Sequence, residues 1–311
     1  MPPAREDRAA WLRLLKTDLA AFNAAINEVD GRYRPDLRGV DLSGLDLRKA
    51  HLGRIDLTGA NLRRAKVRSA GLVSCRLQDV DLTDAEVEAN EETSKIELRM
   101  LQLLWKDVDA FNRERSAISA LNSCDLSDAK LRQADLSGLM IVGTLMSGAD
   151  LSKANLTGST FINSRLRGAS FAKSTLERTN FNGTDLSECT FVDAKLHLFG
   201  TAEGTTLDRT KFDGATFDDA SINGSTGEQP SFARARFKAG GLNSSKFKGA
   251  NFRSAEMNET EIRFVSLIDC DLRDIRATDV TLVSCDIAGS DFRGAKDFEF
   301  KNEENRDRAK F

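Results

Sequence analysis

Five cysteines and two histidines carry the most reactive chemistry in this 311-residue sequence. Zinc sites recruit such side chains at short spacings, typically two cysteines separated by two to four residues. Here the cysteines are widely scattered, and His51 lies far along the chain from His197. We therefore expect no metal, no cofactor and no catalytic centre, so the chain is predicted not to be an enzyme. The cysteines are Cys75, Cys124, Cys189, Cys270 and Cys285.

Basic side chains gather between residues 31 and 78, where eleven Arg or Lys accompany four Asp. Residues 79–92 then hold seven acidic side chains and no basic one. One hypothesis is a patch for an anionic partner; the alternative is a solvated surface on which the bases neutralise the acidic run. No aromatic side chains alternate with the bases, so we expect no direct sequence-specific binding of nucleic acid. The candidate patch consists of Arg48, Lys49, Arg63, Arg64, Lys66 and Arg68.

The overall composition is close to electrical balance, with 45 basic and 48 acidic side chains and a formal net charge of −3. This argues against a generally basic nucleic-acid binder and against a strongly acidic mimic of nucleic acid. No apolar run approaches the roughly 18–20 residues of a membrane span. The first residues lack the apolar stretch of a secretory signal, so we expect a cytoplasmic protein.

Large apolar side chains recur every fifth residue. This period indicates the fold that positions the cysteines, the histidines and the charged side chains. The centres run from Leu37 to Val87, from Leu121 to Leu196 and, with two irregularities, from Leu207 to Phe292. On a helix, successive centres would rotate by about 140° and form no face. On a strand they would alternate between faces. The chain can bury every centre only by turning a corner about every five residues.

A smaller residue stands two positions before most centres, and all five cysteines occupy such positions. We therefore expect each cysteine to point inward as a substitute for alanine, not to act as a ligand or as half of a disulfide. The repeated unit, as in Ala60-Asn61-Leu62, Ala134-Asp135-Leu136 and Ala149-Asp150-Leu151, resembles the pentapeptide-repeat family. The resemblance covers roughly residues 35–88 and 119–295.

The resemblance implies an all-β solenoid, a right-handed quadrilateral parallel β-helix of about eleven coils with four repeats per coil. Residues twenty apart should then stack on one wall. We expect Phe161 to lie over Phe181, and Phe171 over Phe191. The expected organisation is a helical cap (1–31), a first solenoid part (32–88), a helical insertion (89–117), a second solenoid part (118–295) and a charged tail or cap (296–311).

Two segments outside the repeat have helical spacing. Residues 8–30 predict one amphipathic helix that covers the first coil. Residues 89–117 predict a second helix, for which two hypotheses stay open. Its apolar face packs on the solenoid or on the N-terminal helix, or it docks a partner with Trp105 as the anchor. The candidate docking residues are Leu101, Leu104, Trp105, Val108 and Phe111.

Two smaller irregularities interrupt the second solenoid part. Residues 197–205 add one residue to the phase, and Gly227 stands where a large apolar centre belongs. Both segments are predicted to be surface loops, with Phe199, Glu203 and Glu228 as candidate functional residues.

Two classes of function fit the sequence. The first is a non-enzymatic scaffold that binds another protein. The second is a mimic of duplex DNA that binds a topoisomerase, as in family members that engage DNA gyrase and confer resistance to gyrase poisons. Those relatives are strongly negative, whereas this sequence is nearly neutral. The resemblance also implies a possible homodimer through a solenoid end. The sequence does not identify the protein partner.

Overall fold

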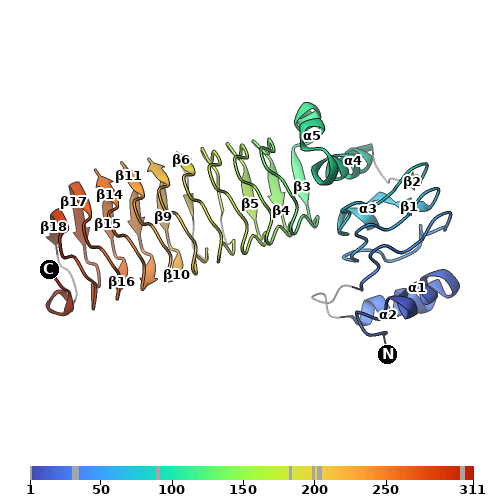
Figure 1. Cartoon of the computed structure of the whole chain (residues 1–311), viewed down its shortest axis with the longest axis horizontal. Helices are drawn as coiled ribbons and strands as arrows, with labels where there is room; N and C mark the ends of the chain where they lie inside the picture. The colour runs from blue at the N-terminus through green and yellow to red at the C-terminus, as the bar shows by residue number, and fades with distance from the viewer. Residues whose placement is uncertain are drawn as a thin grey trace. The chain divides into compact units, whose positions relative to one another are not determined.

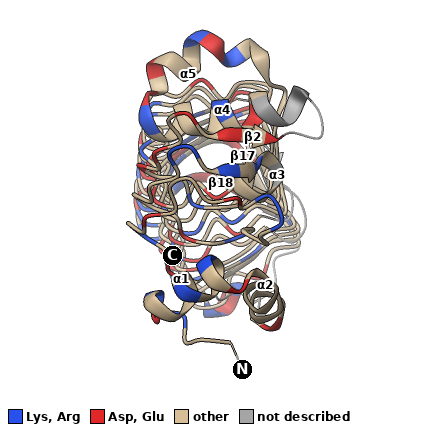
Figure 2. Ribbon diagram, turned by 90° about the vertical axis from the view of Figure 1, so that its right-hand side faces the viewer, with Lys and Arg blue, Asp and Glu red and all other residues tan. Residues whose placement is uncertain are grey.

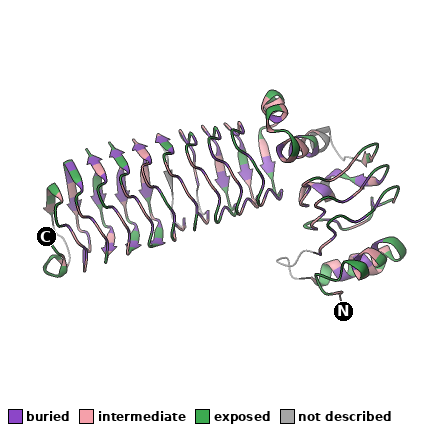
Figure 3. Ribbon diagram, viewed as in Figure 1, coloured by how far each residue is buried: buried purple, intermediate pink, exposed green. Residues whose placement is uncertain are grey.

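The structure, a computed structural model, describes residues 2–29, 35–88, 92–181, 184–197, 200–201, 205–301 and 305–311 (Figure 1). The chain forms two compact units, Met1–Ala129 and Lys130–Phe311. All α-helices of the described residues belong to the first unit. None of them combines the length and the apolar character that crossing a bilayer requires. Buried residues line the inside of the coils in both units (Figure 3).

Two helices, not one, precede the first coil. Asp18 separates α1 (Arg8–Thr17) from α2 (Leu19–Glu28). Its backbone is non-helical, and its carboxylate accepts a hydrogen bond from a backbone N–H in the first turn of α2. The single helix predicted from the sequence is therefore divided, because an aspartate in this conformation caps a new helix. Trp11 and Phe22 are buried in the same apolar cluster as the side chains inside the first coils.

The first unit contains solenoid coils with a spacing of twenty residues. β1 (Lys66–Arg68) pairs in parallel with β2 (Glu86–Glu88), so that Val67 lies opposite Val87. Isolated parallel bridges repeat this spacing in the preceding coils. A short helix that the repeat did not predict, α3 (Ser69–Val73), follows β1, and its Leu72 stays buried as the repeat requires.

The insertion also contains two α-helices where the sequence predicted one. α4 (Glu92–Lys106) and α5 (Val108–Glu114) meet at Asp107, whose carboxylate accepts a hydrogen bond from an N–H of α5. A 3₁₀ turn, η1 (Arg115–Ala117), and the strand β3 (Ala120–Asn122) follow. The wall is then resumed, because Arg76 pairs with Asp125, 49 residues on instead of 20, which leaves 29 inserted residues.

The second unit is a stack of coils joined by parallel strand pairing. Residues in the left-handed backbone region recur every five positions, at Gln133, Gly138, Gly143 and Gly148, so each coil has four corners. The predicted parallel β-solenoid is thus confirmed. Its strands are β4 (Met140–Val142), β5 (Thr160–Ile162), β6 (Lys195–His197), β7 (Gly200–Thr201), β8 (Thr216–Asp218), β9 (Ser221–Asn223), β10 (Thr226–Glu228), β11 (Arg236–Lys238), β12 (Gly241–Asn243), β13 (Lys246–Lys248), β14 (Glu256–Asn258), β15 (Glu261–Arg263), β16 (Ser266–Ile268), β17 (Arg276–Val283) and β18 (Lys296–Lys301).

The interior of this unit is built from stacked side chains. The rings of Phe161 and Phe181 are parallel with centroids 4.7 Å apart, and those of Phe171 and Phe191 are 4.6 Å apart. Both predicted stacks are therefore confirmed. The cysteines occupy the predicted inward positions, and all five are buried.

The two segments that were predicted to be surface loops differ from each other in the structure. The extra residue shows in the register, because Leu196 pairs with Phe217, 21 residues on instead of 20. The loop predicted at residues 197–205 is in part a strand, because β7 (Gly200–Thr201) pairs in parallel with β9. The prediction of a surface loop around Gly227 is wrong. Gly227 is buried in β10, opposite Phe247 of β13, and Glu228 is an exposed residue of the same strand. A glycine fits this interior position because a Cβ there would lie 3.1 Å from the carbonyl oxygen of Leu207.

The C-terminal residues continue the coil instead of leaving it. β18 pairs in parallel with β17, and Lys310 bridges Asp291. A second 3₁₀ turn, η2 (Arg306–Arg308), lies between them. Phe311 stacks on Phe292 with ring centroids 5.4 Å apart. Aromatic side chains thus cover the last regular coil of this unit.

Candidate functional site

Most of the predicted docking face of the insertion is used inside the first unit. Leu101, Leu104 and Phe111 are buried, whereas Trp105 and Val108 are only half-buried. α4 contacts both α3 and α5, which explains why its apolar stripe is covered. The five residues therefore do not form one exposed surface. Only Trp105 and Val108 keep part of their side chains accessible to a partner.

The last coil before the insertion is incompletely covered. Its centres Leu82 and Val87 are half-buried, whereas Leu62 and Val67, one coil earlier on the same walls, are completely buried. The N–H of Leu62 donates to the carbonyl oxygen of Asp81 at 2.8 Å. Within the described part of the chain, the equivalent N–H of Leu82 has no acceptor. On the wall of Leu82, the first unit therefore ends in an open strand edge with a partly exposed interior.

A groove of about 650 Å³ lies between this edge and α4. Trp105 forms part of the helical wall, and the Arg76 guanidinium lies 5.8 Å from its ring centroid. Arg76 is held in place by an ion pair with Asp128 at 3.2 Å. The coil side of the groove is lined by Leu77, Asp79, Val80, Asp81, Leu82 and Thr83, and the helix side by Arg99, Gln102, Leu103, Trp105 and Lys106.

Two of the four charged side chains that line the groove, Asp81 and Arg99, form ion pairs. Hydrogen bonds from the hydroxyl and the N–H of Thr83 hold the pKa of Asp81 below its ordinary value, and Arg63 lies 3.4 Å from the same carboxylate. Arg99 forms an ion pair with Glu114 at 2.8 Å. The groove therefore offers an apolar indole and leucine surface beside an unused backbone donor. These are the groups that an extended peptide uses when it adds to a sheet edge.

The candidate basic patch is largely neutralised by the acidic run that follows it. Lys66 lies 3.1 Å from Glu86, Arg68 3.5 Å from Glu88 and Arg63 3.4 Å from Asp81. Arg48 forms a two-point ion pair with Asp46. Of the six candidate residues, Lys49 and Arg64 alone lack an ion pair within the described chain. This arrangement favours the solvated, self-neutralised surface over an anion-binding patch.

The candidate loop residues do not form a site. Phe199 and Glu203 lie outside the described residues. Glu228 belongs to a regular strand, where its N–H donates to the Asp208 carboxylate at 2.8 Å. The open edge at Leu82 and Val87 was not predicted from the sequence. The sequence signal is limited, because the five-residue phase stops after Val87 but resumes after the insertion, where Leu131 and Leu136 of the second unit stand 49 residues beyond these two side chains.

Comparisons with known proteins agree with the repeat. A model described as a pentapeptide repeat region matches residues 118–191, and a model of eight pentapeptide repeats matches residues 36–72 and 231–274. No curated protein matches the sequence.

Solved structures similar to this chain include trypsin-treated QnrB1, described as a plasmid-mediated fluoroquinolone resistance protein. It is 19% identical, with a TM-score of 0.45, and the match covers 60% of this chain and 90% of that chain. HetL from Nostoc sp. strain PCC 7120, described as involved in heterocyst differentiation regulation, is 19% identical, with a TM-score of 0.21 and 86% of each chain covered.

Proposed function

The chain belongs to the pentapeptide-repeat family, and on that premise we propose that it is a non-enzymatic scaffold that binds an extended segment of a protein partner. The binding site is the groove between the open coil edge and α4. The observation that carries the proposal concerns Leu82, which is half-buried and whose N–H has no acceptor among the described residues. The equivalent residue one coil earlier, Leu62, is buried, and its N–H is hydrogen-bonded.

An added strand would supply the missing hydrogen-bond acceptor and would also cover the exposed apolar side chains. Its carbonyl oxygen would accept from the N–H of Leu82, and its side chains would cover the apolar surface of Leu82 and Val87. Trp105 supplies a rigid aromatic anchor on the opposite wall, fixed by the Arg76 guanidinium. A partner segment with alternating apolar side chains matches this combination, because every second side chain would face the groove.

The charge distribution argues against the alternative, a DNA-mimicking topoisomerase binder. Such a mimic needs a continuous acidic stripe along one wall. Here the outward column that starts at Lys195 continues with Thr216, Arg236, Glu256 and Arg276. Basic and acidic residues are interleaved in the coils (Figure 2). We therefore expect the purified protein to leave DNA gyrase supercoiling unchanged at micromolar concentration, and inhibition at that level would revive the mimic.

Site-specific photo-crosslinking tests the groove. A photoreactive phenylalanine analogue is placed at Thr83 beside the groove and, as a matched control, at Ser43. The two positions are equivalent, since both are exposed and both N–H groups donate to the aspartate two residues earlier. We expect a partner to cross-link from position 83 and not from position 43.

The identified partner is then purified and titrated against the wild type, Trp105→Ala and Phe264→Ala. Phe264 is an exposed aromatic residue of the second unit, with 64% of its surface accessible. Loss of an aromatic anchor should weaken binding by about 2 kcal/mol or more, whereas the Phe264 variant should bind normally. Equal cross-linking from both positions, or a partner that binds Trp105→Ala as tightly as the wild type, would refute the groove.

A further inference from the structure

One outward cluster of the second unit combines an imidazole with two carboxylates. His197 ends β6, and Asp218 ends the adjacent strand β8, so that the two residues are paired in register. Asp219 follows at the corner, in the left-handed backbone region with φ 48°. The ligand atoms that the three side chains offer all lie within 4.8 Å of one another.

The strand register brings the imidazole and the first carboxylate together. Leu196 pairs with Phe217, so that His197 and Asp218, which each follow a buried centre, pair with a spacing of 21 residues. The corner is fixed by a hydrogen bond from the Asp219 N–H to the carbonyl oxygen of Lys238 at 2.9 Å. Backbone pairing on both sides therefore positions the imidazole and the two carboxylates.

The imidazole has an unused nitrogen at this place. His197 Nδ1 is itself buried and has no hydrogen-bond partner among the described residues, although 41% of the His197 side chain is exposed and Asp218 Oδ2 lies 3.3 Å from Nδ1. A metal ion would bind this ring nitrogen and the facing carboxylate oxygen together. One imidazole nitrogen with two carboxylate oxygens is a donor set for borderline divalent cations such as Zn²⁺, Co²⁺ or Ni²⁺.

We propose that His197, Asp218 and Asp219 form a surface site for one borderline divalent metal ion, with water completing its coordination. The inference is independent of the groove, which lies in the other unit. Lys238 Nζ is 3.9 Å from Asp218 Oδ1 and competes with the metal for this carboxylate. Occupation therefore requires the ammonium group to move aside, which its flexible side chain permits.

Other strong metal ligands of the chain do not obscure the test. All five cysteines are buried. The other histidine, His51, is exposed, and its Nδ1 lies 3.3 Å from Asn27 Oδ1. His51→Ala is therefore a matched control for His197→Ala, since each substitution removes one of the two imidazoles of the chain.

Isothermal titration of the full chain with Co²⁺ and Zn²⁺ provides the affinity. We expect one site in the wild type and in His51→Ala, and a loss of about tenfold or more in His197→Ala and Asp219→Asn. Lys238→Gln should bind more tightly, because it removes the competing cation. Circular dichroism checks that each variant keeps the fold, since His197 is half-buried whereas Asp219, Lys238 and His51 are exposed.

Paramagnetic NMR with Co²⁺ identifies the ligand directly. A single set of strongly shifted imidazole signals should appear in the wild type and persist in His51→Ala, and it should be absent from His197→Ala. The proposal fails if the wild type binds no more tightly than His197→Ala, or if the shifted signals disappear with His51→Ala instead.

Discussion

At the scale of single residues, the interior positions are set by stacking on the equivalent residue of the next coil. Phe181 is completely buried, stacks on Phe161 at 4.7 Å and meets Phe171 edge to face at 5.6 Å. Replacing it by alanine removes its contacts with both of these rings. Phe181→Ala should therefore lower the free energy of unfolding by about 3–5 kcal/mol.

Urea denaturation monitored by circular dichroism measures this loss, with Phe264→Ala as the control. Phe264 has 64% of its surface exposed, so its truncation should change the free energy of unfolding by less than about 0.5 kcal/mol. Equal effects of the two substitutions would contradict the stacked interior.

The cysteines give a second prediction at this scale. Burial raises the pKa of the Cys189 thiol to about 12, and burial does the same for Cys270. Both therefore remain protonated near neutral pH, and the thiolate is the reactive species. We expect the native protein to react very slowly with a thiol-specific reagent such as Ellman's reagent. All five thiols should react at once in denaturant; rapid labelling of Cys189 in the native state would show that it faces solvent.

The inward residues could be predicted because a period of five has only one geometrical solution that buries every centre. The same rule failed at Gly227, where the lack of a large side chain led to the prediction of a loop in place of a strand. The backbone pairing of β10 continues through that position, and the Leu207 Cβ already lies 3.2 Å from the place that a Cβ of residue 227 would take. The cluster at His197 was not predicted, because the two histidines were judged by their separation along the chain and not by the residues opposite them in the next coil.

At the scale of elements, the space around two glycines differs between the solenoid strand β10, which contains Gly227, and the short helix α3, which contains Gly71. A Cβ at Gly227 would meet the Leu207 carbonyl at 3.1 Å, whereas at Gly71 in α3 it would meet the Leu52 Cβ at an ordinary 3.9 Å. Gly71→Ala should therefore stabilise the protein by about 0.5–1 kcal/mol, as expected inside a helix. Gly227→Leu should destabilise it by about 1–3 kcal/mol through overpacking, although it restores the repeat.

Thermal denaturation of both variants measures these opposite signs. An unchanged or raised melting temperature for Gly227→Leu would mean that the segment is a loop, as the sequence had suggested. A lowered melting temperature for Gly71→Ala would argue that residues 69–73 do not form a helix.

The helices show where periodicity reaches its limit. The spacing of Leu15, Phe22 and Ile26 continues across Asp18, so the apolar pattern alone predicts one helix. The break is decided by the aspartate, which caps a new helix with its own carboxylate. The same event occurs at Asp107 in the insertion. In both places the aspartate itself indicates that a new helix begins, but the three-to-four-residue spacing of the apolar side chains does not show this break.

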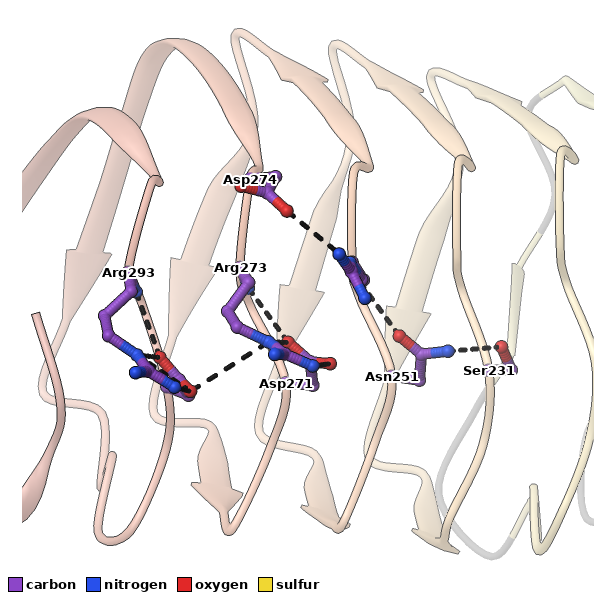
Figure 4. Close-up of polar contacts among 8 residues, drawn as sticks. Ser231, Asn251, Asp271, Arg273, Asp274 and Arg293 are labelled. Carbon is purple, nitrogen blue, oxygen red and sulfur yellow. Dashed lines mark hydrogen bonds and ion pairs between the residues drawn. The ribbon is translucent and has the colours of Figure 1, made fainter.

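At the scale of the whole molecule, the charged side chains form pairs along the walls of the coils. In the second unit, Arg273 binds Asp271 at 2.7 Å, and Arg293 binds Asp291 at 2.7 Å (Figure 4). Arg273 also lies 3.9 Å from Asp291, which links successive coils. The Arg273 guanidinium lowers the pKa of Asp271 below its ordinary value of 3.8, and Arg293 does the same for Asp291.

These lowered pKa values fix how stability depends on pH. A carboxyl group with a lower pKa in the folded state contributes its full stabilisation above its ordinary pKa, and this is lost as the pH falls through the folded value. We expect the urea midpoint to be flat near neutrality and to fall below about pH 4. Asp271→Asn should lower the midpoint at neutral pH, and its difference from the wild type should shrink as the pH approaches about 2. The effect should be modest and should weaken in high salt, because the pair is partly exposed. Asp279→Asn, at an exposed residue without an ion pair among the described residues, is the control. If the difference in urea midpoint between the wild type and Asp271→Asn stays constant down to low pH, the pairing of Asp271 with Arg273 contributes nothing to stability.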